Sequence, residues 1–249
     1  THGEPSVVNA HPHVSKDRKI AVVHNGIIEN YKEIKEYLQK KGYEFLSETD
    51  TEVIAHLLDY YYKGNPLEAI TKVLGRVRGS YALGILFQEN PGVMYAVRKD
   101  SPLIIGKSAQ GNFIASDVPA ILKYTKTVCY IDDREIAEIT ADSIRFYDVD
   151  QEELQKEFKT VEWDAKAAEK EGFEHFMLKE IYEQPKAVAD TISPRIKNGK
   201  IVIDELEMTD EDIKNVSRIQ MVACGSAYHV CVCAKYVLEE LAQIPVDVD

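Results

Sequence analysis

The sequence has 249 residues, of which 45% are hydrophobic, and 30 basic and 42 acidic residues give it a formal net charge of −12. This length and composition fit one large domain or two small ones with a real core. The acidic balance, without any basic stripe, excludes a nucleic-acid-binding surface. No apolar run approaches the roughly 20 residues that cross a bilayer, so we expect neither nucleic acid nor membrane as a partner.

The first part of the chain predicts a strand and a helix that are joined by an Asn-Gly pair. The β-branched run KIAVVH (19–24) favours a strand that ends at Asn25 and Gly26. A helix is expected over residues 27–41, because apolar residues recur there at helical spacing and Gly42 follows.

Two more helices are expected before the chain becomes rich in strands. YEFL (43–46) favours a short strand, and TDTE (49–52) predicts a capping box in which Thr49 caps the helix and Glu52 reaches back. One apolar face marks the helix that follows. An Asn-Pro pair at 65–66 begins the next helix.

Residues 80–148 predict strands separated by turns. Helices followed by many short strands indicate a mixed α+β fold in layers. The segments expected to be strands are SYALGILFQ, VMYAVR, PLIIG, NFIAS, TVCYI, REIAEIT and SIRFYD.

The last hundred residues predict a linker and then a second unit. The charged stretch 150–172 carries little core and is expected to be a partly helical linker. Residues 173–192 predict a helix with a kink or break at Pro185. Residues 218–249 predict a strand, a tight turn, a helix and a further strand, an order that implies a parallel α/β unit.

The cysteines indicate reduced thiols and a cytoplasmic protein. Three of the four lie within ten residues, at 224, 231 and 233, which is not the pattern of a disulfide framework. Cys231 and Cys233 would face different ways on a helix, so packing is favoured over zinc binding and no metal is expected.

Thr1 raises the question of an N-terminal nucleophile, since some amidohydrolases use a terminal Thr, Ser or Cys. It is followed by Gly3 and Pro5, which favour a loop. Because a loop terminus frays, it cannot fix an attacking hydroxyl. We therefore do not assign Thr1 as a nucleophile.

Five motifs resemble a known enzyme family. THGEPSVVNAHPH, HNGIIENYKEI and SETDTEVIAH resemble the glutaminase half of class II glutamine amidotransferases. KEIYEQP and MVACGSAYH resemble the start of the sugar isomerase (SIS) half of those members that aminate fructose 6-phosphate.

The resemblance implies an N-terminal-nucleophile (Ntn) type αββα four-layer sandwich, here incomplete, followed by the beginning of an α/β SIS domain. The implied boundaries are 1–150 for the glutaminase domain, 151–172 for the linker and 173–249 for the SIS start. The family's nucleophile is an N-terminal cysteine ahead of the THGEP motif, and more isomerase residues follow VDVD. We therefore expect the chain to be an interior fragment without activity of its own.

The resemblance assigns the oxyanion hole to Asn25 and Gly26. Glutamine hydrolysis passes through a tetrahedral oxyanion, which two converging hydrogen-bond donors stabilise. An Asn side-chain amide and the next Gly N–H supply both, and glycine lets the backbone approach closely. The alternative is an ordinary Asn-Gly turn, although a strand, this pair and a helix would not make a hairpin.

Substrate contacts are also implied. The Asp50 carboxylate would hold the α-ammonium of glutamine, although an acidic residue in a helix's first turn also compensates the helix dipole, and both roles are compatible. Thr1 and His2 resemble residues that hold the α-carboxylate. His11, His13 and His24 are expected to be structural, because no carboxylate lies at metal-ligand spacing and the base is the terminal amine.

In the second half, Gly225 and Ser226 lie between the predicted strand and the helix N-terminus, where backbone amides favour an anion such as a sugar phosphate. The family often has a second hydroxyl where this chain has Ala227, and a plain tight turn explains the local sequence equally well.

The implied activity is transfer of ammonia from glutamine to fructose 6-phosphate by a homodimer, without metal or organic cofactor. Two alternatives remain: another class II amidotransferase, or a non-catalytic sugar-phosphate-binding regulatory module. The MVACGSAYH segment discriminates against other amidotransferases, because those have different second domains.

Overall fold

The computed structural model describes residues 3–162, 170–203, 206 and 208–249. The chain forms two compact units, residues 1–172 and 173–249, which we describe separately. Within the described residues, no helix is both long and apolar enough to cross a membrane.

A seven-stranded antiparallel sheet forms the centre of the first unit. Its strand order is β1-β2-β3-β4-β8-β9-β10. The strands are β1 (His13–Val14), β2 (Ile20–Ile28), β3 (Gly79–Phe87), β4 (Met94–Lys99), β8 (Ile136–Ile139), β9 (Ile144–Tyr147) and β10 (Glu153–Leu154).

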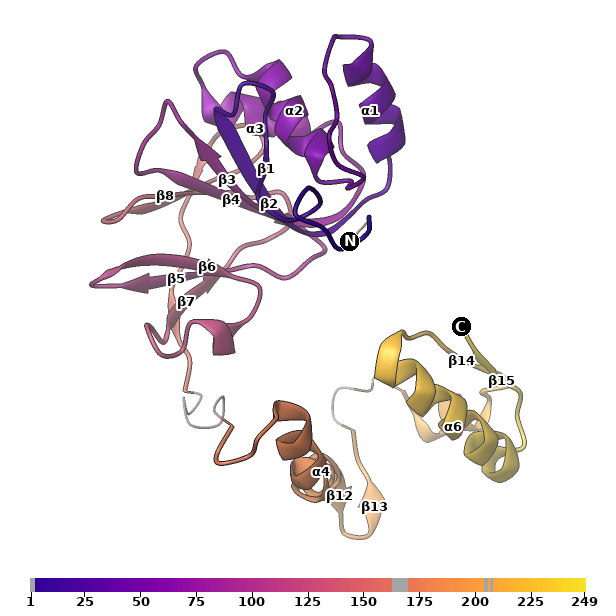
Figure 1. Ribbon diagram of the computed structural model, residues 1–249. Helices are drawn as coiled ribbons and strands as arrows, with labels where there is room; N and C mark the ends of the chain where they lie inside the picture. The colour runs from indigo at the N-terminus through magenta and orange to yellow at the C-terminus, as the bar shows by residue number, and fades with distance from the viewer. Residues whose placement is uncertain (1–2, 163–169, 204–205, 207) are drawn as a thin grey trace. The chain divides into compact units, whose positions relative to one another are not determined.

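Three helices cover one face of this sheet (Figure 1): α1 (Tyr31–Gln39), α2 (Glu52–Tyr61) and α3 (Pro66–Leu74). Their apolar faces and the sheet enclose the largest core. α3 begins as predicted, because the Asn65 side chain accepts a hydrogen bond from the Glu68 N–H and proline occupies the first turn.

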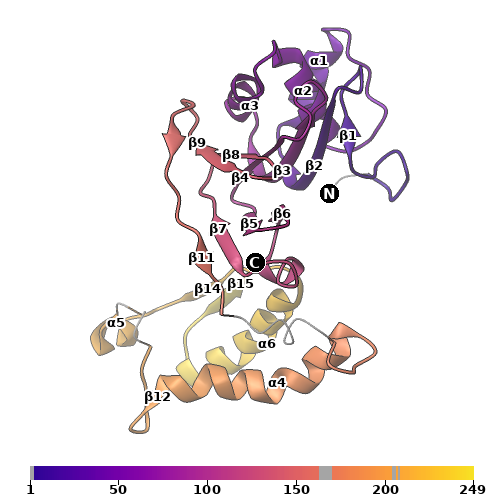
Figure 2. The same ribbon diagram turned by 90° about the vertical axis from the view of Figure 1, so that its left-hand side faces the viewer.

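A four-stranded sheet of order β11-β7-β5-β6 packs against the other face (Figure 2). Its strands are β5 (Ile104–Ser108), β6 (Gly111–Ala115), β7 (Thr127–Tyr130) and β11 (Lys159–Thr160). The outer face of this sheet packs against the short 3-10 helix η1 (Val118–Ala120) and the turn after it. The described part of residues 1–172 thus has an α-β-β arrangement, three layers of the expected four, with no α-helix on that outer face.

Alternation along the strands explains how the central sheet joins two cores. On β3, Tyr81, Leu83 and Ile85 are buried beneath the helices, whereas Ala82 belongs to the cluster between the sheets. Successive side chains of a strand point to opposite faces, so one apolar strand contributes to both cores. All seven strands expected between residues 80 and 148 are present.

The first predicted strand is longer than expected, and the Asn-Gly pair lies inside it. β2 continues to Ile28, which pairs with Gly79 of β3, and α1 begins only at Tyr31. The prediction of a strand-to-helix turn at Asn25 and Gly26 is therefore wrong. Helical spacing of apolar residues was outweighed by pairing with a strand more than fifty positions away.

The segment before α2 contains neither the predicted strand nor the predicted capping box. Residues 43–46 are not in a strand, and no side chain caps α2. The Glu52 carboxylate does reach back, but it accepts hydrogen bonds from the N–H groups of Leu46 and Ser47, at 2.9 and 2.7 Å, rather than from Thr49. These amides bind a carboxylate and not a neighbouring strand.

The charged segment 150–172, predicted to be a partly helical linker, starts with strands. β10 pairs with β9 and β11 pairs with β7, so this segment extends both sheets. The Phe158 ring lies 6.2 Å from the Phe146 ring, centroid to centroid. The prediction of helix there lies partly on residues 163–169, which are outside the described residues.

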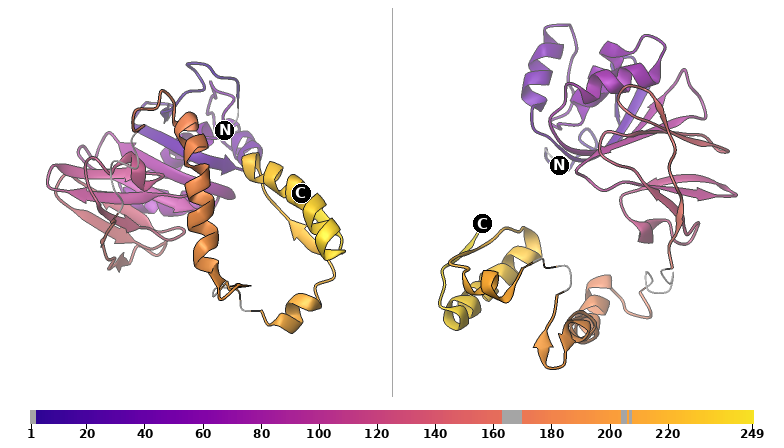
Figure 3. Two further views of the ribbon diagram at one scale, coloured as in Figure 1. Left: turned by 90° about the horizontal axis from the view of Figure 1, so that it is seen from below. Right: turned by 180° about the vertical axis from the view of Figure 1, so that it is seen from behind.

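The second unit contains the predicted strand–helix–strand order. β14 (Ile219–Met221) and β15 (Val246–Val248) are parallel and joined through α6 (Gly225–Ala242). α4 (Phe176–Ile192) continues through Pro185, so of the predicted kink or break the break is wrong (Figure 3, left, orange). The smaller elements are η3 (Ser193–Arg195), β12 (Ile196–Lys197), β13 (Lys200–Ile201) and α5 (Asp210–Lys214).

Candidate active site

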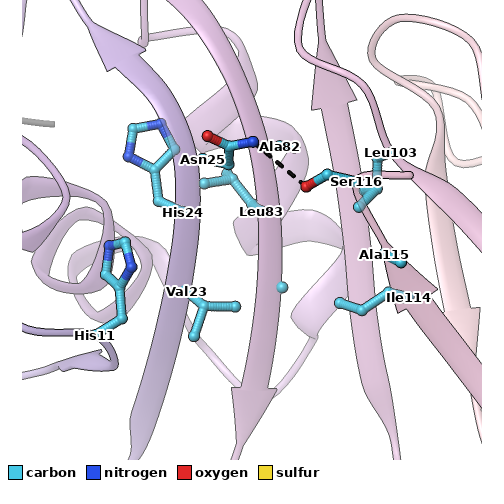
Figure 4. A pocket seen from close by; sticks show the side chains of 11 residues that line it. His11, Val23, His24, Asn25, Ala82, Leu83, Leu103, Ile114, Ala115 and Ser116 are labelled. Atoms are coloured by element: carbon cyan, nitrogen blue, oxygen red, sulfur yellow. Dashed lines mark hydrogen bonds between the residues drawn. The ribbon is translucent and has the colours of Figure 1, made fainter. Parts of the chain in front are cut away.

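The middle of β2 lines a cavity of about 220 Å³ between the two sheets of the first unit (Figure 4). The position follows from strand alternation, because every second β2 side chain points away from the helices. The lining residues are His11, Val23, His24, Asn25, Ala82, Leu83, Gly84, Leu103, Ile114, Ala115 and Ser116.

Asn25 presents its side-chain amide to this cavity. The residue is exposed, and its Nδ2 donates to the Ser116 Oγ over 3.3 Å, which is long for a hydrogen bond. Figure 4 shows the amide directed toward Ser116, which directly follows β6, whereas the His24 ring lies on the other side of β2. The amide can therefore exchange a weak contact for a ligand carbonyl oxygen.

Gly26 follows Asn25 in β2 but does not line the cavity. Its φ is 137°, a conformation that side chains rarely adopt. A Cβ on Gly26 would lie 2.2 Å from the Ser80 carbonyl oxygen. The structure thus brings the Asn25 amide to the cavity and requires glycine next to it because β3 approaches so closely.

Asp50 connects the loop before α2 to the same strand. The residue is 1% exposed, and its Oδ2 accepts a hydrogen bond from the Ile28 N–H at 2.6 Å. Since α2 begins at Glu52, Asp50 precedes the helix, and the prediction that it lies in the first turn is wrong. A carboxylate that accepts from a backbone amide is held in one position.

Thr51 makes a second connection, on the other side of the Asn-Gly pair. Its Oγ1 lies 2.9 Å from the Nδ1 of His24 and 3.3 Å from the Nε2 of His11. Thr51 is 2% exposed and His24 is 9% exposed, whereas His11 is exposed at the cavity wall. One hydroxyl thus contacts both the residue before Asn25 and the loop beside it.

Three histidines of this region, His11, His13 and His24, have pKa values below the usual 6.5. Burial lowers the pKa of His24 to about 4, although the Asp50 carboxylate acts in the opposite direction. Burial likewise lowers the pKa of His11 and of His13. Among the described residues, the His24 Nε2 is buried without a hydrogen-bond partner.

A neighbouring chain of polar side chains fixes the rest of the loop before α2. The His13 Nε2 lies 3.0 Å from the Thr49 Oγ1, which is 3.0 Å from the Ser47 Oγ. Ser47 in turn donates to Glu52 at 2.6 Å. Burial alone would raise the pKa of Glu52, but His56 and the Leu46 and Ser47 donors outweigh it and lower the pKa to about 2.

The buried polar network that surrounds these connections does not follow from the sequence pattern. The pattern of TDTE predicts a helix cap and gives Thr51 no role. A signal was present, since SETDTE carries six polar residues directly before an apolar helix, more than a cap needs. No group of three His, Cys, Asp or Glu side chains suited to a metal ion occurs in the described part of the chain.

The remaining predicted site residues lie elsewhere. Thr1 and His2 are outside the described residues. Gly225 begins α6 with a φ of 60°, and the exposed Ser226 follows it, so both lie at a helix N-terminus as expected. Cys224, the residue before the helix, makes no side-chain capping bond.

Comparison with known proteins gives relatives for most of the chain. Residues 6–123 match a family model described as a glutamine amidotransferase domain. The chain is 57% identical over 250 aligned residues to a glutamine–fructose-6-phosphate aminotransferase (isomerizing) from Clostridium acetobutylicum, covering all of this chain and 41% of that protein. The aminotransferase of the same name from Caldanaerobacter subterraneus is 56% identical with the same coverage.

The chain is similar in sequence to these aminotransferases along its whole length. It spans about two fifths of the length of the curated relatives that it matches. A solved structure of glutamine phosphoribosylpyrophosphate amidotransferase from B. subtilis, complexed with ADP and GMP, shares the fold with a TM-score of 0.53. The two sequences are 16% identical, and the matched region includes 99% of this chain and 50% of the solved chain. The chain therefore has an Ntn amidotransferase-like fold, and Asn25, Asp50 and Thr51 all lie within the residues that match the amidotransferase family model.

Proposed function

We propose that the full-length protein containing this chain hydrolyses glutamine to glutamate and transfers the ammonia to fructose 6-phosphate, giving glucosamine 6-phosphate. The observation that supports this most directly is the Asn25 amide at the wall of a cavity, within a segment that matches the glutamine amidotransferase domain. The curated relatives that match the whole chain carry the name of this reaction.

The proposed chemistry gives Asn25 and Gly26 the role of oxyanion donors. When the amide carbonyl of glutamine is attacked, its oxygen gains negative charge, and preorganised donors stabilise that charge. Asn25 would donate from Nδ2 after releasing Ser116, and Gly26 would donate its backbone N–H. We assign no nucleophile among the described residues.

The remaining site residues would bind the two substrates. Asp50 would hold the α-ammonium of glutamine with its carboxylate, while Thr1 and His2 would hold the α-carboxylate. Gly225 and Ser226 would bind the phosphate of fructose 6-phosphate at the N-terminus of α6.

We also propose an organisation for the whole protein. Residues 1–150 would form the glutaminase domain, 151–172 its connection and 173–249 the start of the SIS domain. The protein would act as a cytoplasmic homodimer without metal or organic cofactor.

The test is ammonia release from glutamine by the full-length protein, with and without fructose 6-phosphate. Asn25→Ala is expected to lower kcat about 100-fold, because one of two oxyanion donors is lost. Asn112→Ala is the matched control: Asn112 is on β6 and donates to the Thr140 carbonyl, away from the cavity. Equal activity of the two variants, or a silent wild-type enzyme, would contradict the proposal.

A further inference from the structure

Two tethers hold β2 on either side of the Asn-Gly pair. The Thr51 hydroxyl contacts His24 directly before the pair, and Asp50 accepts from Ile28 just after it. Both tethers come from adjacent residues of one loop. The strand segment of Asn25 and Gly26 is therefore fixed at both ends by the loop that precedes α2.

The Thr51 hydroxyl contacts two imidazole rings, whereas the Asp50 contact described above is with a backbone amide. The Thr51 Oγ1 lies 2.9 Å from the imidazole of His24 and 3.3 Å from the imidazole of His11. His11 shares the cavity wall with Asn25, so one buried hydroxyl joins the strand that carries the amide to the loop opposite it.

The hydrogen count constrains these contacts. A hydroxyl has one hydrogen to donate, and a neutral imidazole has one N–H and one acceptor nitrogen. Thr51 can therefore donate to only one of the two rings, so at least one of His24 and His11 donates to it. Each ring is thereby fixed in orientation, which a purely apolar contact would not do.

We propose that Thr51 is a positioning residue for Asn25: its hydroxyl fixes His24 and His11 and so directs the Asn25 amide into the cavity. This inference rests on the proposed function, because it concerns the geometry of the proposed oxyanion donor. Thr51 does not line the cavity itself. It acts through the backbone of β2, where small displacements of a donor have large kinetic effects.

Thr51→Val in the full-length protein removes the hydroxyl and keeps the side-chain shape. We expect kcat for glutamine hydrolysis to fall about 10-fold or more, while KM changes less than about 3-fold, because donor direction matters most in the transition state. Thr51→Ser keeps the hydroxyl and is expected to restore kcat.

Thr71→Val provides the matched control. Among the described residues, the Thr71 Oγ1 on α3 is also buried but has no hydrogen-bond partner, so the same substitution there should leave kcat unchanged. If Thr51→Val does not fold, Thr51→Ala takes its place. A merely structural role would give equal losses for Val and Ser, or losses that follow the melting temperature; either result overturns the proposal.

Hydrogen exchange separates this proposal from the proposed function. Peptides covering residues 20–30 of the full-length protein should exchange faster in Thr51→Val than in the wild type or Thr51→Ser, while peptides covering β4 stay unchanged. If the wild type releases no ammonia, the proposed function fails, and the exchange data alone decide the positioning. Identical exchange in all three proteins would overturn it.

Discussion

Glycine at position 26 is what allows β2 and β3 to stay paired where the proposed oxyanion donors lie. The Ser80 carbonyl oxygen occupies the space that a Cβ would need, and the backbone conformation is one that other residues adopt only with strain. The sequence indicated glycine as a residue for close approach, but to a substrate. The observed close approach is to a neighbouring strand.

Replacement of Gly26 tests this close approach. We expect Gly26→Ala to lower the free energy of unfolding by about 1–3 kcal/mol more than Gly111→Ala, because only the former adds an overlap with β3. The two glycines share a φ of 137°, but a Cβ on Gly111 meets nothing within 4 Å. Urea unfolding of both variants measures the difference, and equal destabilisation would show that conformational strain alone matters.

At the scale of elements, local signals predicted well wherever alternation or a cap marks the segment clearly. The strands between residues 80 and 148 and the start of α3 followed alternation and an Asn-Pro cap. The predictions failed at residues 27–30 and 43–52. There, contacts that the local pattern does not encode decide the backbone. The distant strand β3 continues the ladder of β2, and Glu52 binds the nearby amides of Leu46 and Ser47.

The polar network around the loop before α2 predicts acid sensitivity. Below its usual pKa of 6.5, the unfolded chain protonates His24 first, so stability is lost between pH 6.5 and about 4. Glu52 contributes fully above its usual pKa of 4.5, and that contribution is lost as the pH falls toward about 2. Each shift corresponds to something on the order of 3 kcal/mol.

Urea unfolding across this pH range measures the effect. Glu52→Gln should flatten the loss below pH 4.5, and His24→Gln should flatten the loss above it. The exposed Glu48 provides the control, because Glu48→Gln should leave the pH profile of the wild type unchanged. Unaltered profiles for the two buried positions would show that the acid sensitivity arises elsewhere.

For the whole molecule, the two units differ in how much core they contain. Nearly all buried apolar side chains belong to residues 1–172, and among the described residues of the second unit only Lys179 and Val246 are buried. Because burial of apolar surface supplies most of the cooperativity of folding, the first unit dominates the stability of the chain.

Calorimetry tests this unequal distribution of buried core between the two units. Residues 1–172 expressed alone should unfold at the same temperature as the 249-residue chain, with nearly the same enthalpy, since little buried surface is removed. A fall in enthalpy in proportion to chain length, or a large drop in melting temperature, would show that the second unit contributes a core of its own.

The sequence by itself determined the resemblance to glutamine amidotransferases, the mixed helix and sheet composition and the strands of residues 80–148, because these depend on local patterns and on motifs. Only the tertiary structure decided that Asn25 and Gly26 lie within a strand, that Asp50 binds Ile28 and that Thr51 joins His24 to His11. The reason is physical: a buried polar group takes whichever partner the packing of distant segments brings to it, and local spacing does not encode that partner.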